Sequence, residues 1–155
     1  MSVDLRALQD ALKTHAMTSG RLFKTVEAFP PRSAPAVEGV SLHFWLKSVT
    51  PIPARSSLSS VAVVVSFTAQ MFVSDQQMPY AQNDVKLMAA LDWYLGQLVG
   101  DFELGGLVEQ VDVLGAYSPG VTCDAGWQTF DKGAQYRAVT ITIPLVVDDL
   151  WTEAP

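Results

Sequence analysis

Hydrophobic residues recur every three or four positions in two stretches of the chain, which is the spacing of one face of an α-helix. The apolar positions of the first stretch are Leu5, Leu8, Leu12 and Ala16. Ser2 can cap the start of this helix, Asp4 suits its positive end, and Gly20 can end it. The sequence therefore predicts an amphipathic helix close to the N-terminus.

The second helical stretch starts at Asn83-Asp84 and runs to about Gly100. Its apolar stripe, which Trp93 and Tyr94 widen, consists of Leu87, Leu91, Leu95 and Leu98. We expect a second helix here, with one face buried.

Apolar and polar residues alternate in six further segments, and a period of two is typical of β-strands with one buried face. The alternation is longest from Val61 to Ser74, where the odd-numbered residues form an apolar face. Asp131-Lys-Gly133 is a tight hairpin signal between the last two segments. The expected strands cover residues 22–27, 39–49, 61–74, 107–114, 122–130 and 136–147.

The expected order of elements is α-β-β-β-α-β-β-β. Because helices and strands do not alternate as βαβ units, the fold class is α+β, with a mainly antiparallel sheet and two helices packed on it. We expect one domain over residues 1–155. Residues 50–60, rich in Pro and Ser, are expected to be a flexible connector, and residues 148–155 a short tail that leaves the sheet.

Composition and charge narrow the class of protein. The 155-residue chain is 49% hydrophobic and 17% charged, which is typical of a folded globular domain. Residues 1–100 carry eight Lys/Arg against seven Asp/Glu, whereas residues 101–155 carry two against nine. No cluster of Lys and Arg exists to bind phosphates, and an acidic surface repels DNA. With no apolar run at the N-terminus and one cysteine, we expect a soluble protein made in a cytoplasm, without a membrane partner.

Metal and cofactor signatures are missing. His15, His43 and Cys123 lie far apart in the sequence, whereas metal ligands usually lie two to four residues apart. Gly115 and Gly120 match half of a phosphate-binding loop, but the Lys-Ser/Thr pair that would follow is replaced by Val-Thr. We therefore expect neither a metal nor a cofactor.

Catalytic signatures are missing too. Ser118 has the spacing G-x-x-S-x-G, one residue too long for a nucleophile elbow, and a proline follows it, so a turn is favoured. Glu109 and Asp112 differ in parity along an expected strand and would point to opposite faces. The pair Asp148 and Asp149 has nothing near it that would raise a pKa. We expect no enzymatic activity.

The order and texture of the elements resemble the tail terminator, or tail completion, family of long-tailed phages. The resemblance covers nearly the whole chain: the N-terminal helix, the Pro/Ser connector, a helix opening in NDVKLMAALDW, and the final GAQYRAVTITIPL with its acidic tail. It implies a homo-hexameric ring that caps the tail tube protein and joins it to the head-tail connector protein. It also implies a virion location after assembly in the host cytoplasm, with DNA passing through the ring without specific binding.

Three groups of residues are candidates for such a role. An arm that reaches a neighbouring subunit or the tail tube would use Pro51, Pro53, Arg55 and Leu58. The large aromatic residues Trp45, on a polar strand face, and Trp151 are candidate interface residues. Acids expected to face the channel are Asp101, Glu103, Glu109, Asp112, Asp124 and Asp131.

Two other interpretations stay open. A head-completion or tail-tube subunit would share the small, ring-forming α+β character, and a tube subunit would also stack on itself into filaments. A small ligand-binding domain or enzyme would instead need a deep pocket lined by convergent polar groups.

Overall fold

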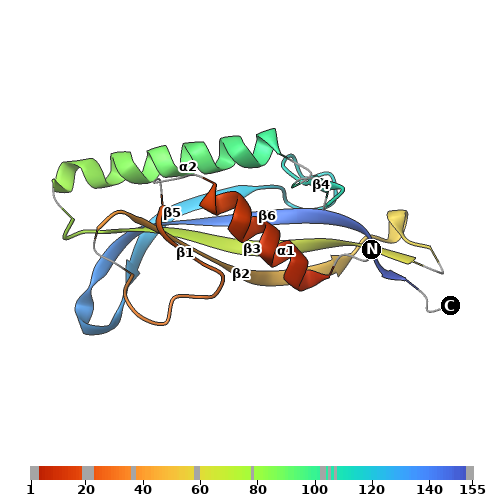
Figure 1. Ribbon diagram of the computed structural model, residues 1–155, viewed down its shortest axis with the longest axis horizontal. Helices are drawn as coiled ribbons and strands as arrows, with labels where there is room; N and C mark the ends of the chain where they lie inside the picture. The colour runs from red at the N-terminus through yellow and green to blue at the C-terminus, as the bar shows by residue number, and fades with distance from the viewer. Residues whose placement is uncertain are drawn as a thin grey trace.

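Two helices pack on one side of a strongly elongated β-sheet (Figure 1). The computed structural model describes residues 4–18, 23–35, 38–57, 60–77, 79–101, 104, 106 and 108–152. Its elements are α1 (Leu5–Met17), β1 (Phe23–Glu27), β2 (Val40–Pro51), β3 (Ser60–Ser74), α2 (Asn83–Gly100), β4 (Gln110–Val111), β5 (Thr122–Thr129) and β6 (Gln135–Thr152). The expected α+β order, α-β-β-β-α-β-β-β, is confirmed.

The sheet is built on the two long strands β3 and β6, which pair antiparallel from Ser74 and Tyr136 at one end to Ser60 and Thr152 at the other. The strand order is β1-β2-β3-β6-β4, and β5 pairs with β6 as well. Of the pairs in the described residues, only β1 with β2 is parallel. The mainly antiparallel character predicted from the alternation is therefore confirmed.

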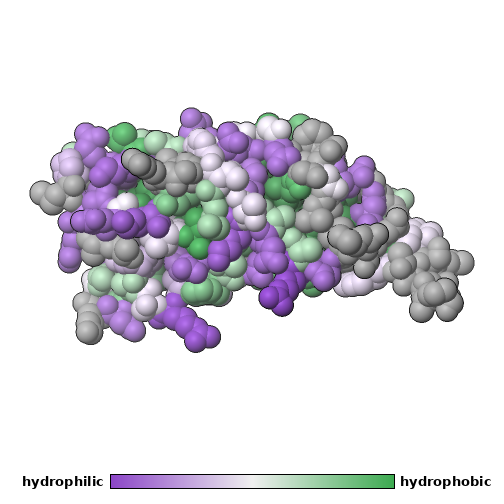
Figure 2. Space-filling view, viewed as in Figure 1, coloured by the Kyte–Doolittle hydropathy of each residue, from purple (hydrophilic) through white to green (hydrophobic). Residues whose placement is uncertain are grey.

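The core lies between the helices and one face of the sheet. The odd-numbered residues of β3 from Val63 to Val73, which form the predicted apolar face, are almost fully buried. They belong to one cluster with residues of both helices, including Leu8, Leu12, Leu87 and Leu98. On the outside of this layer, hydrophilic and hydrophobic side chains alternate over the surface that carries α1 (Figure 2).

The helix boundaries follow local chemistry. Asp4 is the N-cap of α1, because its Oδ1 accepts a hydrogen bond of 2.7 Å from the amide of Ala7. The predicted cap Ser2 and stop Gly20 lie outside the described residues. Helix α2 begins and ends where the sequence predicted. Neither helix is long and apolar enough to cross a membrane, within the ranges that the structure describes.

Three strands differ from the prediction by two residues or more at an end. β6 continues five residues past Val147, with Trp151 opposite Val61, so residues 148–152 belong to the sheet and are not a tail. β2 runs two residues further than expected, to Pro51. β4 has two residues because Asp112 and those after it fold into a turn instead of extending the ladder.

Candidate functional site

The face of the sheet that is turned away from the helices carries a band of polar side chains. One row of this band crosses four neighbouring strands. In order, its residues are Trp45 of β2, Thr68 of β3, Thr142 of β6 and Thr122 of β5. The neighbouring row runs from Gln70 through Thr140 to Asp124. We call these seven residues the polar band; it contains no Lys or Arg.

The polar band is the open middle of this face. All seven residues are half-buried or exposed, whereas both ends of the face are covered. At one end Ile52 packs with Ala62, Val64 and Val146. At the other end Phe72, Tyr136 and Ala138 form a second cluster. Gln70 Nε2 donates a hydrogen bond of 3.0 Å to Thr140 Oγ1, which fixes two of the band's side chains across the strands.

The two candidate interface tryptophans lie apart from each other. Trp45 is half-buried at the β2 side of the polar band, and Trp151 is 50% exposed near the end of β6. Trp127 of β5, which the sequence did not single out for this role, is more exposed, at 55%.

The connector is more ordered within its own chain than the sequence predicted. Ile52 is buried, and its amide donates to the carbonyl of Ala62 at 2.8 Å. Ser56 Oγ donates to the carbonyl of Ile52 at 2.7 Å and accepts from the amide of Ala62 at 3.2 Å. Of the arm candidates, Pro51 ends β2, and Pro53 to Arg55 form a 3-10 turn. Leu58 lies outside the described residues.

The six acids predicted to face the channel lie in different parts of the structure. Asp124 is exposed in the polar band, and Asp131 is exposed in the turn that follows β5. Asp101 and Glu109 are also exposed, but at the far end of α2 and just before β4. Glu103 lies outside the described residues, and Asp112 needs a correction.

Asp112 is not a surface acid, since its exposed fraction is 2%. Its carboxylate accepts hydrogen bonds from the amide of Ala116 at 2.7 Å, the amide of Tyr117 at 2.9 Å and the hydroxyl of Ser118 at 2.7 Å. Burial by itself raises the pKa of Asp112, but the hydrogen bonds from Ser118, Tyr117 and Ala116 outweigh it, so the pKa lies below its usual range. Asp112 organises the turn, and Ser118 is part of that turn as predicted.

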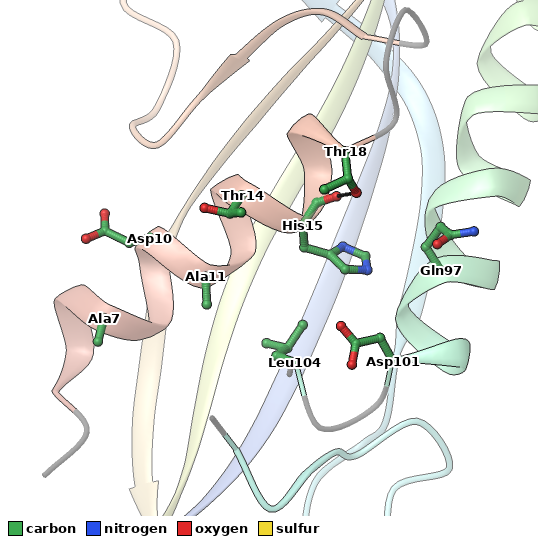
Figure 3. Close-up of a pocket in the computed structure, with 9 residues that line it drawn as sticks. All are labelled: Ala7, Asp10, Ala11, Thr14, His15, Thr18, Gln97, Asp101 and Leu104. Carbon is green, nitrogen blue, oxygen red and sulfur yellow. Dashed lines mark hydrogen bonds between the residues drawn. The ribbon is translucent and has the colours of Figure 1, made fainter. Parts of the chain in front are cut away.

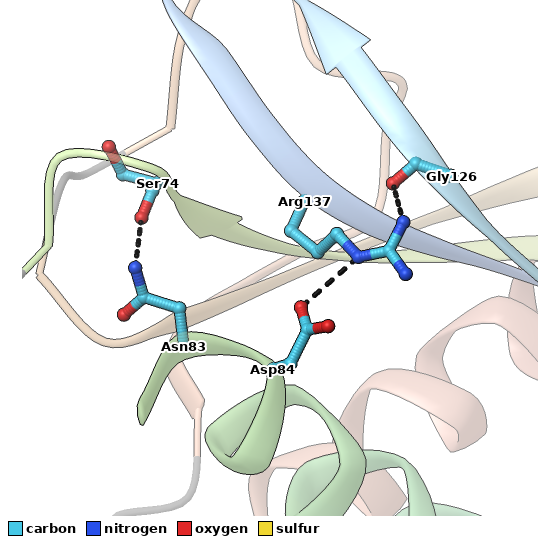
Figure 4. Close-up of polar contacts among 5 residues, drawn as sticks. All are labelled: Ser74, Asn83, Asp84, Gly126 and Arg137. Atoms are coloured by element: carbon cyan, nitrogen blue, oxygen red, sulfur yellow. Dashed lines mark hydrogen bonds and ion pairs between the residues drawn. The ribbon is translucent and has the colours of Figure 1, made fainter. Parts of the chain in front are cut away.

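Strand β5 forms an outer edge of the sheet and is exposed on both faces over most of its length. Next to it, Arg137 of β6 lies 5.4 Å from the ring centre of Trp127 and donates to the carbonyl of Gly126 at 3.1 Å. The Arg137 Nε also pairs with Asp84 at the start of α2, at 3.1 Å (Figure 4). These contacts hold Trp127 in place although half of its surface faces solvent.

The same end of α2 is tied to the sheet. Asn83 Nδ2 donates to the carbonyl of Ser74 at 3.1 Å (Figure 4). It also donates to the carbonyl of Gln77 at 3.1 Å. The start of α2 is therefore fixed to the end of β3 beside the ion pair.

A groove of about 620 Å³ lies between α1 and the end of α2. His15 points from α1 toward Gln97 and Asp101 in this groove (Figure 3). Both ring nitrogens of His15 are buried without a hydrogen-bond partner among the described residues. The ring of Tyr94 packs edge-on against the imidazole, with 6.0 Å between the two ring centroids. Burial raises the pKa of Tyr94 far above its ordinary value. No group of three or more metal-ligating side chains occurs within the described ranges.

The chain is similar to a solved structure at low sequence identity and matches no family model. No protein-family model matches the chain, and no curated protein matches its sequence. Among solved structures, a chain of the "Virion of native gene transfer agent (GTA) particle" is similar over 90% of this chain and 93% of its own length, with 15% sequence identity and a TM-score of 0.45.

Proposed function

We propose that this chain is a non-enzymatic structural protein of a phage virion, the tail terminator subunit that forms a hexameric ring on the finished tail tube and joins it to the head connector. The observation that carries the proposal is the order of elements. The resemblance in sequence rests on two helices that divide six strands in the order α-β-β-β-α-β-β-β, and the folded chain has that order.

The polar band supports the ring as a conduit for DNA. Hydroxyl and amide groups dominate it, and its one charged residue, Asp124, is negative. DNA binding without sequence preference depends on Lys and Arg that neutralise phosphates. A channel wall of this chemistry would let DNA pass without retaining it, and acids such as Asp124 and Asp131 would add repulsion.

The end of the β2–β3 hairpin is proposed as the arm that reaches a neighbouring subunit or the tube. Its base is anchored by Ile52 and Ser56, and Pro53 and Arg55 in the 3-10 turn are the described candidates for contact with a partner. Replacing residues 53–59 by a short Gly-containing turn removes the Ser56 hydrogen bonds but keeps Ile52 and the bond from its amide to Ala62. Folding should survive this change and ring or tail joining should weaken; unchanged assembly would reduce the segment to a surface loop.

The test of the terminator role is to add the protein to polymerising tail-tube subunits from the same virion and measure tube lengths by electron microscopy. A terminator stops growth and yields capped tubes of reduced length. Tubes of unchanged length without a cap would contradict the proposal, and filaments of the pure protein would favour a tube subunit instead.

A further inference from the structure

The sheet has two open edges of nearly equal length. On one side, β5 (Thr122–Thr129) pairs with β6, and no strand or backbone hydrogen bond of the described residues occupies its other side. On the opposite side, β1 covers β2 only at residues 40–43, so no strand among the described parts of the chain pairs with the outer side of residues 44–51 of β2. Such edges are templates for pairing with another chain.

We propose that β5 of one copy of this chain pairs with residues 44–51 of β2 in the next copy, so that the sheets continue around the ring. This inference rests on the proposed ring and names its contact surfaces. β2 and β6 run in the same direction, because each is antiparallel to β3, and β5 runs against them. Copies related by rotation about a ring axis therefore present β5 to β2 antiparallel, the pairing that needs no crossover.

A pocket on β2 fits Trp127, the exposed large hydrophobic residue of β5. It has a volume of about 310 Å³ and is lined by Leu5, Arg6, Gln9, Leu46 and Phe67. Trp127 points to the helix side of the sheet, as its partner Arg137 does, and Leu46 points to the same side, as its partner Phe67 does. In the adjoining copy the indole would enter this pocket beside the Leu46 side chain, 44% exposed, and the cation of Arg6.

If Trp127 lies opposite Leu46, every further pair between β5 and β2 consists of two residues that point to the same side of the sheet. β2 has an irregularity between Leu46 and Ser48, where Lys47 is the extra residue. Across it, Gly126 meets Ser48, and Ala125 meets Val49, which packs on the helix side. Cys123 then lies opposite Pro51, and the exposed Lys47 lies between two and three rungs from the exposed Asp124.

The register also fixes a tilt. Within one copy, the register of the sheet aligns Trp127 of β5 with Val40 of β2. If Trp127 instead pairs with Leu46 of the next copy, that copy is shifted along the strands by about six residues, or roughly 20 Å. The repeat of four strands from β2 to β5 is about 19 Å wide. The strands would lie about 45° from the ring axis, at the upper end of the tilt that closed β-barrels adopt.

The native Cys123, which is free and exposed, allows a direct test. In Pro51→Cys, each copy carries one thiol on either edge, and directly opposed residues in an antiparallel pair lie close enough for a disulfide. With oxidised glutathione as the oxidant, we expect a ladder of covalent oligomers on a non-reducing gel. The matched control is Val85→Cys, 51% exposed on α2, which should give no ladder beyond collisional dimers.

If Pro51→Cys and Val85→Cys give equally weak bands of disulfide-linked oligomers, the proposed pairing of the two edges is wrong. If the wild-type protein nevertheless forms a ring by native mass, the proposed function stands and the contact lies elsewhere. A ladder without an end would keep the pairing but contradict the closed ring. As a second variant, Trp127→Ala should lower the affinity between copies at least tenfold in sedimentation while leaving the fold intact; unchanged association would also refute the proposal.

Discussion

Replacing the buried carboxylate of Asp112 should destabilise the protein strongly. In Asp112→Asn the charge is lost, and the side chain can no longer accept all three hydrogen bonds from Ala116, Tyr117 and Ser118. Hydrogen bonds to a charged group contribute about 1.5–3 kcal/mol each, and unsatisfied buried donors add a penalty. Because the asparagine oxygen can keep one or two of the contacts, we expect a loss of about 3 kcal/mol in the free energy of unfolding.

Urea denaturation at pH 7 measures this loss. With a slope of about 2 kcal/mol per molar urea, the midpoint should fall by about 1.5 M. Ser118→Ala removes one of the three bonds and should cost about 2 kcal/mol. The matched control Asp124→Asn changes an exposed acid and should cost under about 0.5 kcal/mol.

Acid adds an independent check. The pKa of Asp112 is lowered in the folded state, so its stabilising contribution is complete above the unfolded pKa of about 4 and is lost as pH falls through the lower folded value. The difference in stability between wild type and Asp112→Asn should therefore shrink as the pH falls below 4. A variant that loses less than about 1 kcal/mol at pH 7, or a difference that does not change with pH, would refute this account of the turn.

Three further predictions use other parts of the structure. Ile52→Ala should lower the free energy of unfolding by about 3 kcal/mol, measured by urea denaturation, because Ile52 is buried under the hairpin; the exposed Val85→Ala should change it little. The ring should not bind DNA at physiological salt, whereas Thr142→Lys in the polar band should bind it in a salt-dependent manner by fluorescence anisotropy. Equal binding by Met88→Lys, on the helix side, would contradict a band that faces DNA. A broad hydrolase and nucleotide screen should show no turnover; turnover that one point mutation abolishes would contradict the structural role.

The fold was predictable where local periodicity decides it. The alternation of β3 and the apolar stripe of α2 gave the right elements because the packing against one core demands those periods. The end of β6 was missed because its acidic residues suggest a solvated tail, whereas pairing with β3 at Val61 extends the strand through Trp151.

The candidate surfaces were less predictable, because they depend on which strands become neighbours. Asp112 was expected on a strand and, because of the acid excess of residues 101–155, facing the channel, but the chain turns there and the carboxylate organises the turn. The polar band could have been noticed in part from Thr140 and Thr142, which alternate with apolar residues in the otherwise apolar stretch 138–147 of β6. Its continuation to Thr68 and Thr122 requires the register of three strand pairs, which no local pattern gives.

The mass of the native particle tests the central claim most directly. Native mass spectrometry or light scattering of the purified protein, combined with single-particle electron microscopy, gives both copy number and shape. A closed hexamer of 16.8 kDa subunits has a mass of about 101 kDa and should show an axial channel. A protein that remains a monomer at all concentrations and also on tail tubes, or that assembles only into open filaments, would contradict the terminator ring.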